Sequence, residues 1–172
     1  DPADREIERR LRQLLFRNRA IPDDHPLTTD WPVAPVICSS VWGVADTTLR
    51  TEARGLRWDP PLKSHADFAR LHPATLSVDR AAGAARLAVH QELLGDILEV
   101  RPGGVNAVRC GLTRKLIVLR GLEPFLLDLH DAPGFVHDLM SFLRDEQLAE
   151  LDFLEREGQL GLNNGAMDLT GS

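Results

Sequence analysis

The stretch DAPGFVHDLMSFLRDEQLAELDFLEREGQLGLNNG, Asp131–Gly165, carries the longest regular pattern in the chain. From Phe135 to Leu154 its apolar residues, Leu148 among them, recur at helical spacing, which predicts a long amphipathic helix with these residues on its apolar face. Asp131 is placed to cap this helix, and Gly158 is placed to end it. At 1.5 Å per residue the helix would be roughly 35 Å long. We expect QLGLN, residues 159–163, to follow as a strand, so the stretch predicts one helix-to-strand unit of an α/β fold.

The rest of the chain alternates helical and extended patterns. Helices are expected over residues 5–19, 65–71, 80–95, 107–121 and 123–131. The first of these is expected to carry Ile7, Leu11, Leu14 and Leu15 on one face. Strands are expected at 36–42 and 96–100, an exposed hairpin at 47–62 and a turn-rich loop at 21–32. Strands separated by helical segments predict parallel pairing, and the apolar run at 36–42 suits a strand buried on both faces. A closed barrel needs about 250 residues, so the pattern predicts an open α/β sheet or part of a (β/α)8 barrel, as one domain over residues 1–172.

Composition and charge exclude several classes of protein. The chain is 43% hydrophobic and 27% charged, with a net charge of −6, which argues against generic nucleic-acid binding. Residues 5–19 hold six Arg against two Glu, whereas residues 123–172 hold eleven acidic residues against two Arg. No apolar run is long enough to predict a membrane span. Cys38 and Cys110 have no metal-site spacing, and we expect both to be buried and the protein to be cytoplasmic.

Motifs that would name a reaction are missing from the sequence. It has no glycine-rich phosphate loop, and its six His show no ligand spacing, so we expect no metal site built from this chain alone. The remaining evidence for a site is the position of residues along the predicted strands, because ligands of parallel α/β folds bind at the carboxyl ends of strands. Those ends are expected to offer Trp42 for stacking, Arg101 for gripping a carboxylate, and the amides of Asn163 and Asn164. We take these four as candidate substrate-binding residues.

Several of these segments resemble a known superfamily. LRGLEPFLLDLHDAPGFVHDLMSFL, the long helix that ends in LEREG, and the loop LGLNNGAMDLTGS are similar to the uroporphyrinogen decarboxylase-like superfamily. The resemblance covers nearly all of the chain and is strongest over residues 107–164. It implies a (β/α)8 TIM barrel of which this chain would be the N-terminal half, a fragment of a longer protein. Members often carry a loop of the form LNND followed by YVGSGG, and the tyrosine of that loop has no counterpart in MDLTGS here.

The resemblance implies one of two activities. Decarboxylases of the superfamily remove the acetate arms of uroporphyrinogen without a cofactor, and they grip substrate carboxylates through an arginine-rich RQAGRY stretch after the first strand. The corresponding place here reads SSVWGVADTTLR, which favours the other group, methyltransferases that pass a methyl group between a corrinoid and a thiol. Those enzymes hold zinc through an H-x-C pair and a later Cys, which would lie outside this chain. Cys38 and Cys110 therefore do not inherit that role.

Three alternatives stay open at this point. The first is a methyltransferase-like enzyme that uses a corrinoid and zinc. The second is a decarboxylase of a tetrapyrrole or another polycarboxylate, with Arg50, Arg54, Arg57 and Arg101 as its anion grip. The third is a non-catalytic half-barrel that serves as a binding or scaffold chain. A half-barrel would expose strand edges and apolar faces, so its expected partner is a second half-barrel or a further copy of the same chain.

Overall fold

The chain forms two compact units, each built from segments that are distant in sequence. The first unit comprises Asp1–Pro35, Arg80–Ala107 and Gln159–Ser172, and the second comprises Val36–Asp79 and Val108–Gly158. The structure, a computed structural model, describes residues 2–21, 27–40, 42–44, 48–50, 56–106, 108 and 110–162. The expectation of a single domain over residues 1–172 stays a prediction. Helices and strands occur in both units, so the mixed α/β class is confirmed.

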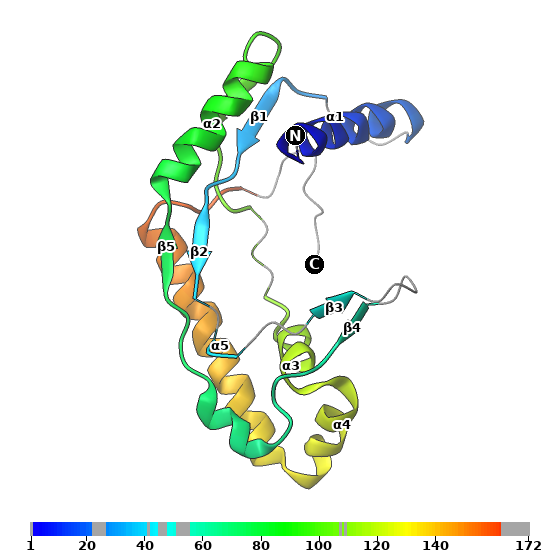
Figure 1. Ribbon diagram of the computed structural model, residues 1–172, viewed down its shortest axis with the longest axis vertical. Coiled ribbons are helices and arrows are strands. Elements are labelled where there is room, and N and C mark those ends of the chain that lie inside the picture. The colour runs from blue at the N-terminus through cyan, green and yellow to red at the C-terminus, as the bar shows by residue number, and fades with distance from the viewer. Residues whose placement is uncertain are drawn as a thin grey trace. The chain divides into compact units, whose positions relative to one another are not determined.

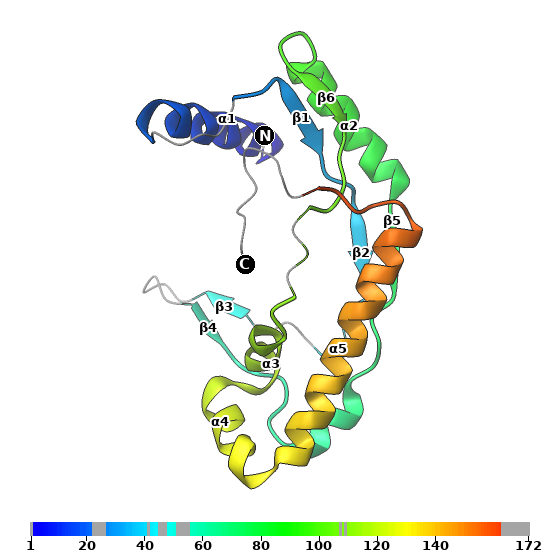
Figure 2. The ribbon, with the colours of Figure 1, turned by 180° about the vertical axis from the view of Figure 1, so that it is seen from behind.

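Parallel strand pairing organises the first unit. Strand β1 (Asp30–Val33) pairs in parallel with β6 (Glu99–Pro102), and the register runs from Asp30 opposite Glu99 to Val33 opposite Pro102. These two strands lie alongside each other and beside helix α2 (Arg80–Leu94) (Figure 2). One further parallel bridge joins Val105 to Leu160. Three segments of the first unit therefore run in the same direction, and each is paired with the next one along the chain.

The core of the first unit forms where helix α1 (Pro2–Ala20) and helix α2 meet strand β1. Its buried residues are Ile7, Trp31, Val33 and Leu94. Leu11 and Leu14 of α1 pack against them at the helical spacing that the sequence predicts. The predicted face also included Leu15, and this part was wrong, because Leu15 is exposed.

Two glycines allow the last parallel segment to approach closely. A Cβ atom added at Gly104 would stand 2.5 Å from the backbone nitrogen of Gly161, well inside van der Waals contact. A Cβ at Gly161 would in turn lie 3.1 Å from the backbone of Gly104. The amide of Gly161 donates to the carbonyl of Val105 at 2.9 Å across this contact. Side chains at either glycine would therefore push the two segments apart.

The strands differ from the sequence-based prediction in three ways. Residues 21–32 were expected to form a loop, but Asp30–Val33 is a strand in spite of Pro32. Among the described residues β1 pairs with β6 alone, and an edge strand tolerates a proline because one row of its amides needs no partner. The strand expected at 96–100 begins later, at Glu99, because residues 95–97 form a turn after α2.

The third difference concerns the strand expected at 36–42, buried in a parallel sheet. The strand there, β2 (Ile37–Ser39), is shorter, and it pairs antiparallel with β5 (Leu76–Val78) in the second unit (Figure 1). Cys38 and Ser39 are exposed, so β2 is not a strand buried on both faces. The apolar run was therefore correctly read as extended but wrongly placed in a parallel sheet.

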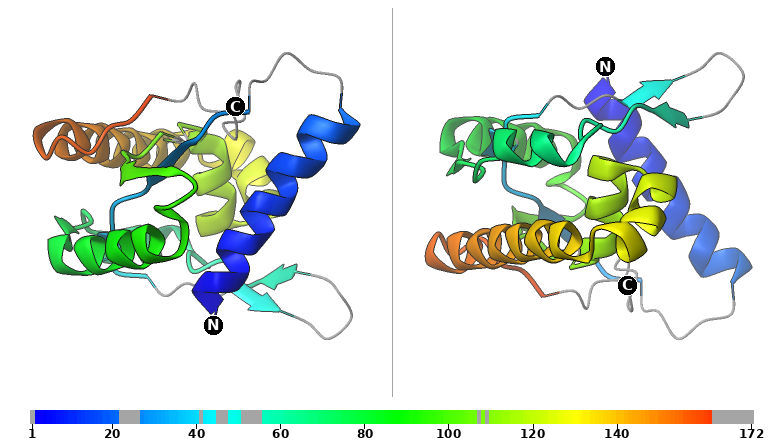
Figure 3. Two further views of the ribbon diagram at one scale, coloured as in Figure 1. Left: turned by 90° about the horizontal axis from the view of Figure 1, so that it is seen from above. Right: turned by 90° about the horizontal axis from the view of Figure 1, so that it is seen from below.

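Helices dominate the second unit. Helices α3 (Leu112–Arg120) and α4 (Leu122–Asp131) lie beside the long helix α5 (Pro133–Arg156), as the two views of Figure 3 show. The predicted hairpin is confirmed as β3 (Thr48–Arg50) paired antiparallel with β4 (Leu56–Trp58). The short helix expected after Ser64 is a 3-10 helix, η1 (His65–Arg70), and Ser64 and Asp67 form its capping box.

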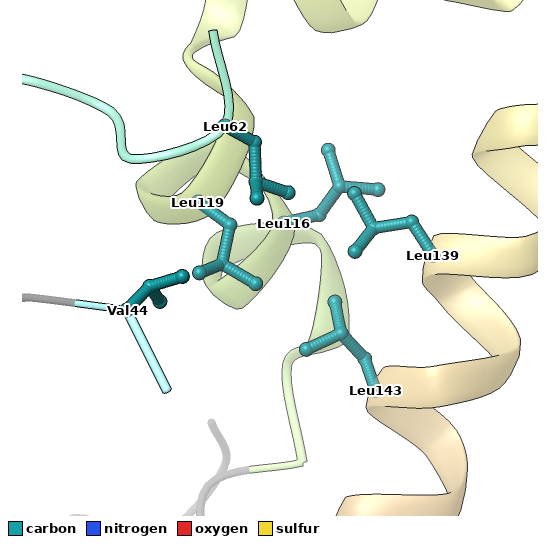
Figure 4. Packing of buried hydrophobic residues seen from close by; sticks show 6 residues of the cluster. All are labelled: Val44, Leu62, Leu116, Leu119, Leu139 and Leu143. Carbon is teal, nitrogen blue, oxygen red and sulfur yellow. The ribbon is translucent and has the colours of Figure 1, made fainter. Parts of the chain in front are cut away.

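The core of the second unit is a leucine-rich cluster. It consists of Val44, Leu62, Leu116, Leu119, Leu139 and Leu143. Leu139 and Leu143 point from α5 toward the leucines of α3, and Leu62 closes the cluster from the segment after β4 (Figure 4). Burial of these side chains stabilises the packing of α3 on α5, at roughly 1.5–3 kcal/mol for each fully buried leucine.

Helix α5 confirms the long amphipathic helix that the sequence predicts after Asp131, with two corrections. It ends before Gly158, which has the positive φ of +63° that favours glycine after a helix. Asp131 does not cap it, because Asp131 is the last residue of α4 and the N-cap position belongs to Ala132. Leu148 was expected on the buried face but is exposed. The strand expected at 159–163 is represented in the described residues only by the bridge at Leu160.

Two further observations concern cysteines and membranes. Cys38 and Cys110 are both free and exposed, so the expectation that they are buried was wrong. Cys38 lies in β2 opposite Ser77 of β5. None of the helices described for this chain combines the length and the apolar composition needed to cross a bilayer.

Candidate functional site

Ligands of parallel α/β folds bind at the carboxyl edge of the strands, and Arg101 was predicted to lie at that edge. Sequence placed Arg101 in a turn after a strand, but the structure places it inside β6, opposite Pro32. Its guanidinium forms a two-pronged ion pair with Asp30, with Nε 2.5 Å from Oδ1 and Nη2 2.6 Å from Oδ2. The hydrogen bonds that Arg101 donates to the Asp30 carboxylate raise the pKa of Arg101. Arg101 thus already grips a carboxylate, and that carboxylate belongs to its own chain.

Trp42 lies in the second unit, half-buried against the leucine-rich cluster. Its ring meets the edge of Phe142 at 6.2 Å between centroids, and the Lys115 ammonium stands 5.8 Å from its centre. Its backbone carbonyl accepts a hydrogen bond from the amide of His72 at 3.2 Å. These contacts make Trp42 part of the packing, and its role as a stacking platform for a ligand stays a prediction.

Asn163 and Asn164 lie outside the described residues. The segment that leads to them is fixed at the carboxyl end of β6, where the amide of Val105 donates to the carbonyl of Gln159 at 2.6 Å. The four predicted residues therefore do not form one described cluster. Arg101 belongs to the first unit, Trp42 belongs to the second, and the role of the two asparagines stays a prediction.

A different polar cluster, which sequence reasoning missed, lies in the second unit. Asp128 on α4 is only 5% exposed, and both of its carboxylate oxygens are engaged. Arg120 at the end of α3 donates from Nε to Oδ2 at 2.7 Å, and His65 Nε2 lies 2.8 Å from Oδ1. The same guanidinium donates from Nη1 to the carbonyls of Leu62 and Lys63, at 3.0 and 2.8 Å. We call Asp128, Arg120 and His65 the carboxylate cluster.

Electrostatics and stacking fix the geometry of the carboxylate cluster. The hydrogen bond from Arg120 holds the pKa of Asp128 below its ordinary value, against the opposing effect of burial, and His65 adds to the lowering. The imidazole of His65 stacks on Phe135 at 4.4 Å between centroids, with 29° between the planes. Its side chain is nevertheless 48% exposed. The cluster therefore presents to solvent an imidazole whose orientation is set by a buried carboxylate.

Chemically, such a His–Asp pair can orient an imidazole for proton transfer, and it can equally tie a loop to two helices. Among the described residues no three His, Cys, Asp or Glu side chains gather closely enough to hold a metal ion. The only sequence signal for the cluster was Ser64, which marks the start of η1 and thereby places His65 at a helix start. Nothing in the sequence links His65 to Asp128, because 63 positions separate them.

A second histidine contact, which is partly buried, lies in the first unit. Trp31 donates from Nε1 to Nδ1 of His90 at 2.9 Å, and the Arg10 guanidinium lies 4.0 Å above the Trp31 ring. Burial lowers the pKa of His90, and the positive charges of Arg10 and Arg86 add to this effect. The contact joins α2 to β1 and keeps the imidazole neutral, which suits a hydrogen-bond acceptor in a core.

No family model, curated protein or solved structure matches the chain.

Proposed function

We propose that the chain is the N-terminal part of a uroporphyrinogen decarboxylase-like (β/α)8 barrel enzyme. The observation that carries this proposal is the succession of parallel segments in the first unit. β1 pairs with β6, and Val105, just beyond β6, pairs with Leu160. Parallel neighbours require long crossovers, and both crossovers here contain helices. Consecutive parallel pairing in chain order is the arrangement by which a barrel of this kind is built.

In such a barrel the substrate binds at the carboxyl ends of the strands. Those ends correspond here to residues 34–35, 103–106 and 161–162, all in the first unit. Asn163 and Asn164 follow the third of these ends directly, so they remain the candidate residues nearest to the expected mouth. The proposed ligand is a small molecule or a tetrapyrrole-type compound.

Of the two activities, we favour methyl transfer over decarboxylation. A decarboxylase of the superfamily needs an arginine-rich stretch after its first strand, and the corresponding place in this chain reads SSVWGVADTTLR, which lacks that stretch. Arg101, the described candidate for a carboxylate grip, is paired with Asp30. Both observations weaken the alternative of a decarboxylase. They leave the methyltransferase-like enzyme as the proposal that the residues support best.

Methyl transfer in this superfamily uses a corrinoid as methyl carrier and zinc to activate the acceptor thiol. The described residues offer no group of three potential metal ligands. The proposal therefore places the zinc ligands in parts of the complete protein outside these residues. The contribution of this chain would be to line the mouth and to position the ligand through the two asparagines. A second half-barrel, or another copy of the chain, would complete the barrel wall.

The test is a methyl-transfer assay of the complete protein with methylcobalamin, a thiol and Zn²⁺. Turnover is measured as the loss of the methylcobalamin absorbance. The double variant Asn163→Ala/Asn164→Ala should lower turnover by about tenfold or more, if both amides hold the reacting molecule. Asn18→Ala is a matched control, because Asn18 is an exposed asparagine on α1. Control and wild type should turn over equally.

Three outcomes would contradict the proposal. Absence of both turnover and corrinoid binding would rule out the methyltransferase. Release of CO₂ from uroporphyrinogen would establish the decarboxylase instead. Binding of a tetrapyrrole without turnover of either kind would favour a non-catalytic binding chain.

A further inference from the structure

The outward face of α1 carries a regular row of arginines. Arg5, Arg12 and Arg19 are seven residues apart, so they line one side of the helix at intervals of about 10 Å. All three are exposed, whereas the core side of the helix is formed by Ile7 and its neighbours. Phe16 lies between Arg12 and Arg19 on this face and is 66% exposed. We call this row the arginine stripe.

The outward face of α5 carries a matching row of opposite charge. Asp138, Asp145 and Asp152 are also seven residues apart, and all three are exposed. Leu148 lies between Asp145 and Asp152 and is 53% exposed. We call this row the aspartate stripe. In both stripes the charged residues are seven positions apart, and one large apolar side chain lies between the second and the third charge.

The ends of both stripes have no ion-pair partner within the part of the chain that the structure describes. Arg5, Arg19, Asp138 and Asp152 form no ion pair with another described residue. The central members do have one within their own helix region. Arg12 pairs with Glu8 at 2.6 Å, and Asp145 pairs with Arg144 at 2.7 Å. Such exposed pairs contribute little free energy, so they exchange readily for a partner on another molecule.

The two stripes fit each other. In a parallel alignment of the helices each arginine lies opposite an aspartate, and Phe16 and Leu148 come within the rise of one residue of each other. Charge complementarity sets the register and speeds the encounter, while burial of the two apolar side chains supplies the affinity. Exposed apolar side chains rimmed by charges are typical of interaction surfaces.

We propose that the arginine stripe of one molecule docks on the aspartate stripe of a second copy of this chain. The contact joins two unlike surfaces, so it is heterologous and leaves one free stripe on each partner unless the assembly closes. A contact between two single helices is small, so the association is weak and depends on concentration. This inference does not rest on the proposed function, because neither stripe includes a candidate substrate-binding residue.

The experiment is the measurement of molar mass by light scattering during size-exclusion chromatography, over a range of protein and salt concentrations. Wild type should exceed the 19.1 kDa of one chain at high protein concentration and return to it at high salt. Reversal of one stripe, as R5E/R12E/R19E or as D138R/D145R/D152R, should raise the dissociation constant by about tenfold or more. Phe16→Ala should weaken association without altering its salt dependence.

Mixing the two reversed variants is the decisive step. In the mixture, the unaltered aspartate stripe of the first variant meets the unaltered arginine stripe of the second, and the acidic α1 of the first also faces the basic α5 of the second. An equimolar mixture should therefore associate more strongly than either variant alone. Glu92→Arg and Arg114→Glu, exposed charge reversals outside both stripes, are the controls and should behave as wild type. Where an arginine reversal lowers the helical circular dichroism signal, the neutral R5Q/R12Q/R19Q variant replaces it.

Three results would overturn the inference. Wild type that stays at the mass of one chain at every concentration and at low salt has no second copy to bind. Association that the control reversals weaken as much as the stripe reversals depends on net charge alone. A mixture that fails to associate, while wild type does, shows that the two stripes do not meet each other.

Discussion

Removal of the Asp128 carboxylate should be the most destabilising single polar change in the second unit. The carboxylate neutralises Arg120, whose side chain is only 10% exposed, and it also holds His65. In Asp128→Ala the Arg120 guanidinium remains buried without a counter-charge. Arg120 and His65 both lose the hydrogen bonds that they form with the carboxylate. Truncation of one member of a buried ion pair costs about 3–5 kcal/mol.

Two features of the site reduce that figure. Arg120 keeps its hydrogen bonds to the carbonyls of Leu62 and Lys63, so part of its hydrogen bonding survives. His65 is half exposed and can regain water, so its lost contact adds little. We therefore expect Asp128→Ala to lower the free energy of unfolding by about 2–4 kcal/mol. Asp128→Asn keeps the volume and some hydrogen bonds, and its effect should fall at the lower end of this range.

The assay is urea unfolding followed by far-ultraviolet circular dichroism at neutral pH. Asp131→Asn is the matched control, because Asp131 is an exposed aspartate on the same helix, and the free energy of unfolding should change by less than about 0.5 kcal/mol. An Asp128→Ala effect below about 1 kcal/mol, or equal to that of the control, would refute the assigned role of the ion pair.

The same residue predicts a pH dependence. The pKa of Asp128 is lowered in the folded chain, so the folded state favours the carboxylate more than the unfolded state does. Its contribution is therefore fully present above the unfolded pKa of about 3.9 and is lost as the pH falls through the folded value. The difference in stability between wild type and Asp128→Asn should be constant from neutral pH down to about 5 and should shrink below about 4. A difference that grows on acidification would contradict the sign.

Three further predictions concern packing, backbone and titration. Leu143→Ala should lower the free energy of unfolding by about 2–5 kcal/mol because Leu143 is fully buried, whereas the exposed Leu148→Ala should change it by less than about 0.5 kcal/mol in the same urea assay. Gly43→Ala should destabilise by about 1–2 kcal/mol, since φ there is +78° and a Cβ would overlap a neighbouring imidazole. Gly83→Ala in α2, where a Cβ meets nothing, should instead stabilise by about 0.5–1 kcal/mol, and equal effects at the two glycines would contradict the geometry. The imidazole of His90 should titrate below the range of a histidine in water, and an NMR titration at or above that range would disprove its burial as a neutral acceptor.

The sequence by itself determined which segments form helices, although α3 begins at Leu112 and not at residue 107 as expected. Periodic apolar residues over many turns outweigh local noise, which is why α2, α5 and the core face of α1 were predicted close to their observed bounds. Gly158 could be predicted as a stop, because its positive φ is a local requirement that glycine meets at no steric cost. The β3–β4 hairpin was predictable for a similar reason, since its partners are close in sequence.

Only the tertiary structure decided which strands pair and what the polar side chains contact. A four-residue strand such as β1 has no periodicity to detect, and its pairing with β6 depends on a segment about seventy positions away. Arg101 could be predicted as a carboxylate grip from its chemistry, but the identity of its carboxylate, Asp30, followed from strand register alone. The carboxylate cluster has the same origin, because the packing of η1, α3 and α4 brings His65 and Arg120 to Asp128. Helix formation is governed by neighbours along the chain, whereas ion pairs and strand partners are set by neighbours in space.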